Sequence, residues 1–256
     1  MTNQRSVVVT GAESGMGAAC ATAFGEIGDS VAVFYFSDSA AAQRSVAAVE
    51  KAGGRAQAIQ CDVADPASVD RAFAAAEQAF GPVSVAVNSA GINMAGVKVR
   101  DMPDEQWRRM LATDLTGAFN VSRRFIRGHA KASGPAALIH ISSIHAAVVR
   151  IGGADYCAAK AGVTNLVETL ALEEAANNIR VNAIRPGMIL TPMNERAVED
   201  AAYRRSLEAN IPVGRAGRPD EVAMMARWLA SDEASYVTGA SFTIDGGLSL
   251  LLGVGA

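Results

Sequence analysis

A serine, a tyrosine and a lysine stand at spacings that suit proton transfer to and from an alcohol or carbonyl oxygen. Tyr156 and Lys160 are i and i+4, so on a helix they share one face and the ammonium lies beside the phenol. A nearby cation favours the phenolate, which suits the phenol to act as acid and base. Ser143 follows an apolar run from Ala136 to Ile141 that predicts a buried strand. Its hydroxyl can hydrogen-bond the same oxygen, although a Tyr-x-x-x-Lys pair also arises by chance.

A glycine-rich turn follows the first predicted strand, Ser6 to Thr10, and leads into a helical pattern that starts at Met16. Strand, glycine turn and helix form the context of a dinucleotide-binding fingerprint, with the pyrophosphate at the helix N-terminus. Its glycines allow the tight turn, the close approach of the pyrophosphate and helix-on-sheet packing. The glycines in those positions are, in order, Gly11, Gly15 and Gly17. The alternative is that they only mark a strand–helix turn.

Five motifs in this order make the chain similar to the short-chain dehydrogenase/reductase family over nearly its whole length. They are Thr10-Gly11-x-x-x-Gly15-x-Gly17, Asn88-x-Ala90-Gly91, Ser143, Tyr156-x-x-x-Lys160 and Pro186-Gly187. Each motif is weak by itself, and the ordered set is specific. The resemblance implies a Rossmann-type fold and hydride transfer between a nicotinamide cofactor and a secondary alcohol or carbonyl.

The resemblance also implies catalytic roles. Tyr156 is expected to be the acid and base, Ser143 to polarise the substrate oxygen, and Lys160 to assist Tyr156 and bind the nicotinamide ribose. Family members usually carry asparagine where this chain has Asp114. The carbonyl of that asparagine holds a water linked to the lysine, and its side chain holds a helix irregularity. A carboxylate accepts but does not donate hydrogen bonds, so the carbonyl role carries over and the side-chain role is in question. The added charge is expected to hold Lys160 protonated.

The cofactor preference is predicted from the loops after the first two strands. Tyr35 stands where NAD-specific relatives have aspartate, and Ser14 where many NADP enzymes have arginine. With Glu13 and Asp38 nearby and no cation, a 2′-phosphate is poorly compensated, so we expect NAD and leave NADP open. Asp62 fits an adenine contact or a turn that precedes a helix. The expected cofactor contacts are Gly11, Glu13, Ser14, Gly15, Met16, Gly17, Tyr35, Phe36, Ser37, Asp62, Val63, Asn88, Ala90, Gly91, Tyr156, Lys160, Pro186, Gly187, Ile189 and Thr191.

The substrate is predicted from loops similar to those of bacterial glucose 1-dehydrogenases and related aldose dehydrogenases. Polar residues around the pocket favour a sugar or polyol, because a buried sugar needs many hydrogen bonds. Methionines in the same loops favour an apolar substrate. A 3-oxoacyl-thioester reductase and a non-catalytic binding or regulatory protein of this fold are the alternatives. The expected substrate contacts are Asn93, Ser143, His145, Tyr156, Met188 and Asn194.

The chain of 256 residues predicts one α/β domain, residues 1–256, with a doubly wound parallel sheet. Strands are expected near residues 6–10, 30–36, 55–61, 83–87, 136–142, 179–185 and 241–244. Helices are expected near residues 15–27, 39–52, 66–80, 104–131, 155–176 and 219–230.

Composition excludes several classes of function. The net charge of −3, with scattered basic residues, gives no support for nucleic-acid binding. Cys20, Cys61 and Cys157 have no metal-ligand spacing and are expected to be free buried thiols, so no metal is predicted. The absence of a long apolar segment favours a soluble cytoplasmic enzyme without membrane contact. The apolar tail from Leu248 to Ala256 is expected to pack into a neighbouring subunit, or close beside its pocket, in a homotetramer.

Overall fold

A seven-stranded parallel sheet forms the centre of the molecule, in the order β3-β2-β1-β4-β5-β6-β7. The computed structural model describes residues 4–94, 96–130 and 134–253. Strands β1 and β5 are buried at every position, as expected for valine-, isoleucine- and alanine-rich strands covered on both faces. The strands are β1 (Ser6–Thr10), β2 (Ser30–Tyr35), β3 (Arg55–Gln60), β4 (Val83–Asn88), β5 (Ala136–Ile141), β6 (Ile179–Pro186) and β7 (Ser241–Ile244).

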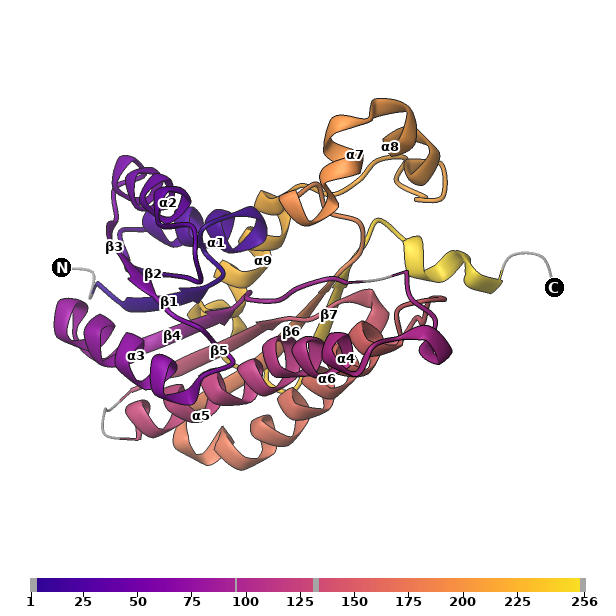
Figure 1. Ribbon diagram of the computed structural model, residues 1–256. Helices are drawn as coiled ribbons and strands as arrows, with labels where there is room; N and C mark the ends of the chain where they lie inside the picture. The colour runs from indigo at the N-terminus through magenta and orange to yellow at the C-terminus, as the bar shows by residue number, and fades with distance from the viewer. Residues whose placement is uncertain (1–3, 95, 131–133, 254–256) are drawn as a thin grey trace.

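Helices cover both faces of this sheet (Figure 1). Each face has its own core, the first around Phe24 and Leu229 and the second around Phe73 and Phe125. The first face carries α1 (Gly15–Gly25), α2 (Ser39–Lys51) and α9 (Pro219–Leu229). The second carries α3 (Pro66–Phe80), α5 (Gly117–His129) and α6 (Ala154–Glu174). The predicted single Rossmann-type domain is confirmed.

The strand order reverses between β1 and β4, and ligands of open α/β sheets bind at the carboxyl ends of the strands at such a point. Local sequence fixes the helices that start there. Asp38 accepts a hydrogen bond from the amide of Ala41 and begins α2. Asp65 accepts from the amides of Ala67 and Ser68 and begins α3. Both are favourable N-caps, because a carboxylate satisfies free amides of the first turn.

The helix expected over residues 104–131 is interrupted. It consists of α4 (Asp104–Met110), a π-helical segment, η2 (Leu111–Thr116), and α5, while residues 131–133 lie outside the described part of the chain. A π-helical turn adds a residue to the helical circuit and often lies at a functional site. Here it carries Asp114, which is buried.

Two short helices were not predicted. They are α7 (Glu195–Glu199) and α8 (Ala201–Glu208), and they stand above the carboxyl ends of the strands in Figure 1. The side chain of Asp200 accepts from the amides of Ala202 and Tyr203 and so caps α8.

A chain of buried polar groups ties β1, β4 and β5 together beneath the strand ends. The Thr10 hydroxyl donates to Asn88 Oδ1 at 2.7 Å, while its oxygen accepts from the amides of Ser89 and Ala90 at 3.1 and 3.0 Å. These bonds hold the start of the loop after β4 against the end of β1. The position of that loop therefore depends on side chains inside the sheet.

His140 continues this chain into α5. The Ser122 hydroxyl donates to the Ala118 carbonyl at 2.7 Å, so its oxygen accepts from His140 Nε2 at 3.0 Å. His140 Nδ1 then accepts from Asn88 Nδ2 at 3.3 Å. These roles assign one neutral tautomer, with the proton on Nε2. Burial, followed by the charge of Lys160, lowers the pKa of His140 to about 3.

We expect His140 to make the protein less stable in mild acid. The unfolded chain binds a proton on this residue below about pH 6.5, whereas the folded chain does so only near pH 3. Stability is therefore lost as pH falls through this window, by about 1.4 kcal/mol per pH unit. His140→Gln should remove this slope from urea-unfolding free energies measured at several pH values.

Ser122→Ala is the matched control, because it breaks the same chain of hydrogen bonds but keeps the titrating group. It should lower stability and retain the slope. An unchanged slope in His140→Gln would contradict the assignment.

In the described residues, no helix is both long and apolar enough to cross a membrane. The three cysteines are buried and free, as predicted. No group of three or more potential metal-ligating side chains occurs in the described part of the chain.

Candidate active site

Two adjoining cavities open at the carboxyl ends of the strands. The first, of about 430 Å³, lies over the glycine-rich turn, and the second, of about 500 Å³, lies over the ends of β5 and β6. Met16, Thr191 and Met193 line both. A ligand in the first cavity can therefore contact a ligand in the second.

The glycine-rich turn forms one wall of the first cavity through close backbone packing. Gly11 and Gly15 have φ of +62° and +54°, a region that favours glycine. A Cβ on Gly11 would lie 2.9 Å from Ala90 Cα, and one on Gly17 would overlap the Gly11 carbonyl oxygen. The turn thus leaves backbone amides at the start of α1 open to a bound anion, as a pyrophosphate requires.

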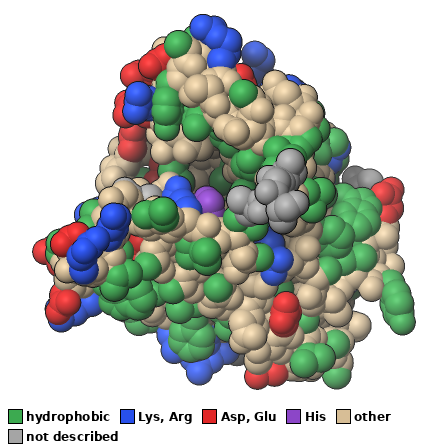
Figure 2. All heavy atoms as spheres, turned by 90° about the vertical axis from the view of Figure 1, so that its right-hand side faces the viewer, with side chains coloured by type: hydrophobic (Ala, Val, Ile, Leu, Met, Phe, Trp, Pro, Cys, Tyr) green, Lys and Arg blue, Asp and Glu red, His purple; other side chains and the backbone are tan. Residues whose placement is uncertain are grey.

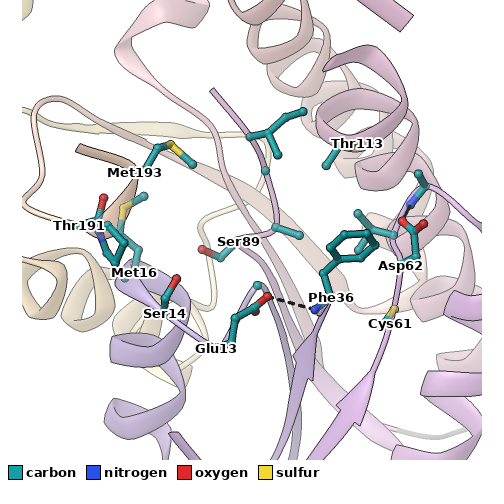
Figure 3. A pocket seen from close by; sticks show the side chains of 18 of the residues that line it. Glu13, Ser14, Met16, Phe36, Cys61, Asp62, Ser89, Thr113, Thr191 and Met193 are labelled. Atoms are coloured by element: carbon teal, nitrogen blue, oxygen red, sulfur yellow. Dashed lines mark hydrogen bonds between the residues drawn. The ribbon is translucent and has the colours of Figure 1, made fainter. Parts of the chain in front are cut away.

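Glu13 and Phe36 meet across the far end of this cavity (Figure 3). Glu13 Oε1 accepts from the Phe36 amide at 3.0 Å. Glu13 Oε2 is buried without a hydrogen-bond partner in the described residues. The end of β2 thus lies beside a carboxylate supplied by the glycine-rich turn.

The second cavity is lined by Ser143 and Tyr156, the serine and tyrosine predicted to be catalytic. Ser143 Oγ accepts from the His145 amide at 3.1 Å, which leaves the hydroxyl proton for another acceptor. Tyr156 lies in the first turns of α6 and is 9% exposed. Figure 2 shows the hollow on this face, with a histidine and a basic side chain side by side within it. His145 and Arg150 line this cavity.

Lys160 and Asp114 form a buried ion pair behind these residues. Nζ lies 3.0 Å from Oδ2, and the side chains are 7% and 0% exposed. Lys160 Nζ also donates to the Ile141 carbonyl at 3.3 Å, and Asp114 Oδ1 accepts from the Ile92 amide at 2.8 Å. Burial alone lowers the pKa of Lys160, but the charges of Asp114 and Tyr156 outweigh it, and the net direction is upward.

Gly91 makes room for this ion pair. A Cβ at Gly91 would lie 3.0 Å from Asp114 Oδ2 and 3.3 Å from Lys160 Nζ. The absence of a side chain therefore lets the loop after β4 pass directly over the pair. The expected charge effect of Asp114 is present, and its carboxylate accepts a backbone bond while it lies in the π-helical segment.

The ring of Tyr156 is held from several sides. The Tyr156 amide donates to Asp155 Oδ1 at 2.8 Å, and Gln106 donates to Asp155 Oδ2 at 2.9 Å. Lys160 Nζ and the guanidinium carbon of Arg150 lie 5.5 and 5.3 Å from the ring centroid. The centroids of the Tyr156 and His145 rings are 6.2 Å apart. Two cations and one imidazole thus surround the candidate acid and base.

Besides Ser143 and Tyr156, the polar residues expected to bind substrate already have protein partners. His145 Nδ1 donates to the Val148 carbonyl at 2.7 Å, which leaves Nε2 as an acceptor. Asn194 Nδ2 donates to the Ile189 carbonyl at 2.7 Å. Asn93 Oδ1 accepts from Arg150 Nη2 at 2.7 Å. Burial chiefly lowers the pKa of His145, the hydrogen bond to Val148 opposes this, and the charge of Arg150 adds to it.

Most residues predicted for the site border the two cavities. Those in the first are Gly11, Glu13, Ser14, Gly15, Met16, Phe36, Asp62, Val63, Ala90, Gly91 and Thr191. Those in the second are Met16, Asn93, Ser143, His145, Tyr156, Pro186, Gly187, Met188, Ile189, Thr191 and Asn194. Asp62 also fits the alternative interpretation, because its Oδ1 accepts from the Ala64 amide in a turn.

Six predicted residues lie outside the lining of both cavities: Gly17, Tyr35, Ser37, Asn88, Asp114 and Lys160. Lys160 and Asp114 lie behind the lining as the ion pair. Asn88 uses its side chain inside the sheet, and Tyr35 packs on the first core. Ser37 is exposed at the surface.

Sequence reasoning missed Arg150, Gln106 and Asp155. Asp155 is adjacent to Tyr156 in the chain and is an acidic residue in the first turn of α6, which is the one local signal it offered. Gln106 and Arg150 approach Tyr156 from separate elements, α4 and the loop before α6. Their contribution depends on contacts between segments far apart in the sequence.

Comparison with known proteins agrees with this geometry. The profile of a family described as enoyl-(acyl carrier protein) reductase matches residues 11–249. The chain belongs to the short-chain dehydrogenase/reductase family. Members of this family are oxidoreductases that use nicotinamide cofactors, and the named relatives are dehydrogenases that act on CH–OH groups.

Three similar proteins illustrate the range within the family. The chain is 45% identical to 3β-hydroxysteroid dehydrogenase 1 of Eggerthella lenta, over 97% of this chain and 95% of the relative. It is 35% identical to glucose 1-dehydrogenase 2 of Bacillus subtilis, over 96% and 95%. The crystal structure of acetoin dehydrogenase from Enterobacter cloacae matches with a TM-score of 0.91 and 32% identity, over 100% of both chains.

Proposed function

We propose that this protein is an NAD-dependent dehydrogenase that oxidises a secondary alcohol on an apolar ring, or reduces the corresponding ketone. The observation that carries the proposal is the position of Ser143 and Tyr156 in a cavity that adjoins the glycine-rich turn, with Lys160 behind Tyr156. These are the groups that alcohol oxidation needs beside a dinucleotide site.

The residues divide the work by their hydrogen-bonding capacity. Ser143 donates its hydroxyl proton to the substrate oxygen, because its own oxygen already accepts from His145. Tyr156 takes the hydroxyl proton of the alcohol, and Lys160 favours the phenolate that receives it. The nicotinamide cofactor, when bound, supplies hydride acceptance or donation. Tyr156 and Ser143 are both largely buried, so few water molecules reach their hydroxyl groups once a substrate occupies the cavity.

The first cavity fits a dinucleotide, and the Glu13 carboxylate at the end of β2 favours NAD. The glycine-rich turn leaves room for a pyrophosphate at the start of α1. Glu13 lines this cavity at the end of β2, and its carboxylate is the group that would accept from a ribose hydroxyl. A 2′-phosphate at the same place would meet this carboxylate, and like charges repel. Asp38 is engaged in capping α2 and contributes less.

The second cavity favours an apolar ring over a sugar. Its lining includes Val148, Met188, Leu207, Ile211 and Leu248. The expected sugar-binding groups already use part of their hydrogen-bonding capacity within the protein. Less of it remains for a polyhydroxylated ligand, and a buried hydroxyl without a partner is costly. The steroid dehydrogenase at 45% identity supports this choice, while glucose 1-dehydrogenase at 35% keeps the sugar as the second candidate.

A substrate panel tests the proposal. Purified protein with NAD⁺ and a 3β-hydroxysteroid, a substituted cyclohexanol, glucose or acetoin is followed through absorbance of the reduced cofactor. We expect kcat/KM for the ring alcohols to exceed that for glucose about tenfold or more. Tyr156→Phe should lower kcat by about 10²–10⁴-fold and leave NAD⁺ affinity unchanged in calorimetry. Near-normal turnover in Tyr156→Phe would refute its assignment as acid and base.

A second prediction concerns the cofactor. Glu13→Gln keeps an acceptor for the Phe36 amide but removes the charge, so the ratio of kcat/KM with NADP to that with NAD should rise about tenfold. Asp38→Asn is the control: asparagine also caps helices, and the ratio should change little. A wild-type protein that prefers NADP would show that backbone amides and Ser37 bind the phosphate.

We also infer a cytoplasmic homotetramer. Three buried free thiols suit a reducing compartment. Leu248 and Ser249 line the second cavity of their own chain, while Leu250 is 81% exposed and supports contact with another subunit. Deletion from Leu250 onward should reduce the number of subunits in the assembly, which light scattering measures through the particle mass. An unchanged tetramer would rule out a role for this tail in assembly.

A further inference from the structure

The positive charge of Lys160 near Tyr156 is paired with a carboxylate, so Lys160 does not act on the phenol as an isolated cation. Lys160 lies 5.5 Å from the ring centroid, but its ammonium is 3.0 Å from the Asp114 carboxylate. An ammonium and a carboxylate in contact act at a distance as a dipole, whose field falls faster than that of a single charge. The stabilisation that Lys160 gives a phenolate is therefore partly cancelled.

Arg150 is a second cation that contacts the Tyr156 ring, and it comes from the loop before α6. Its guanidinium carbon is 5.3 Å from the ring centroid, and its Nη2 donates to a neutral partner, Asn93. Arg150 is absent from the ion pairs of the described residues. Its positive charge is thus held beside the phenol without a carboxylate to oppose it.

Packing fixes Arg150 in this position. A Cβ on Gly153 would lie 2.8 Å from both Cγ and Nε of Arg150, so the side chain rests directly on the backbone that begins α6. Nε is buried there without a hydrogen-bond partner. The close approach depends on glycine at residue 153, whose φ of −127° does not itself require glycine.

Each of the other ionisable groups that face Tyr156 has a partner within the protein or has its positive charge disfavoured. On α6 itself, Asp155 accepts from the Tyr156 amide and from Gln106, and Lys160 is paired with Asp114 of η2. From the turn after β5, His145 lies edge-on to the ring, and burial with the charge of Arg150 holds its pKa below the ordinary value. Arg150 is therefore the cation near the ring whose charge remains uncompensated.

We propose that Arg150 is a positioning residue that stabilises the Tyr156 phenolate, in a site where Asp114 neutralises the lysine that would otherwise do so alone. The proposal rests on the function of Tyr156 as acid and base. Arg150 and Asp114 are then a compensating pair that act on the same proton with opposite sign, although no contact between them is needed. The arginine is expected to set the pH at which alcohol oxidation begins.

The test is the pH dependence of kcat/KM for alcohol oxidation. Arg150→Gln should move the rising limb to higher pH by about one unit, because the phenolate forms less readily. Arg150→Lys keeps the charge and should stay near wild type. Asp114→Asn should move the limb to lower pH, and the double variant should return toward wild type. A limb that stays in place in Arg150→Gln would overturn the proposal, even if activity or melting temperature falls.

Gly153→Ala provides a variant that retains the arginine. Its Cβ must displace the Arg150 side chain, so the limb should move in the same direction as in Arg150→Gln. An unmoved limb in a folded Gly153→Ala protein that still binds cofactor would count against the geometry.

A measurement without substrate separates this proposal from the proposed function. Phenolate absorbance of the NAD⁺ complex, less that of Tyr156→Phe, gives the titration of Tyr156 directly. A shift in Arg150→Gln would support the proposal even if every alcohol in the panel failed. Turnover of an alcohol with no shift in this titration would overturn the role of Arg150 and leave the dehydrogenase assignment intact.

Discussion

The buried ion pair between Lys160 and Asp114 is the constraint around which the site is arranged. Two charges removed from water are tolerated only where each has close partners, and loss of one partner from such a pair typically costs about 3–5 kcal/mol. The partners here come from three elements: the Ile141 carbonyl at the end of β5, the Ile92 amide after β4 and the π-helical segment that carries Asp114. Bare backbone at Gly91 lets these elements meet. The same pairing that stabilises the lysine in the interior also weakens its field at Tyr156. A second cation is therefore needed to stabilise the phenolate.

Hydrogen bonds inside the sheet fix the position of the loop that passes over the ion pair. Ser122, His140, Asn88 and Thr10 form one ordered chain from α5 to the loop after β4. Each donor in it has one acceptor, so a reversed tautomer of His140 would leave two groups facing like partners. The loop that passes over the ion pair is thereby fixed from below. Buried polar networks of this kind give a unique arrangement when every member is satisfied, and a charged imidazole would break the chain in the middle.

The sequence predicted the parts of the molecule that local rules determine. A valine-rich run such as Ser6–Thr10 is typical of a buried strand. The glycines at 11, 15 and 17 occupy positions where the structure shows close backbone approach or positive φ. Local rules did not predict the interruption of the helix at Leu111–Thr116. The family resemblance implied a helix irregularity at the position of Asp114 but left open whether a carboxylate would keep it. Helix α8 is short and held by its cap at Asp200, a signal present in the sequence but too brief to separate from a turn. Arg150 reached the site only through contacts with Asn93 and Gly153, which no periodicity encodes.

The two ends of the site carry opposite charge, and this polarity bears on which reaction the protein performs. Glu13 gives the adenosine end a carboxylate, whereas Arg150 gives the reacting end positive charge, because the charge of Lys160 is paired with Asp114. A carboxylate beside the ribose disfavours a second phosphate there, and cations beside the phenol favour the form that accepts a proton. Both effects suit removal of hydride and proton from an alcohol with NAD⁺. The second cavity is also lined by Leu207, Ile211 and Leu248, whose apolar side chains suit an apolar ring. The charge pattern and this apolar lining therefore support the same proposal, a ring alcohol oxidised by the non-phosphorylated cofactor.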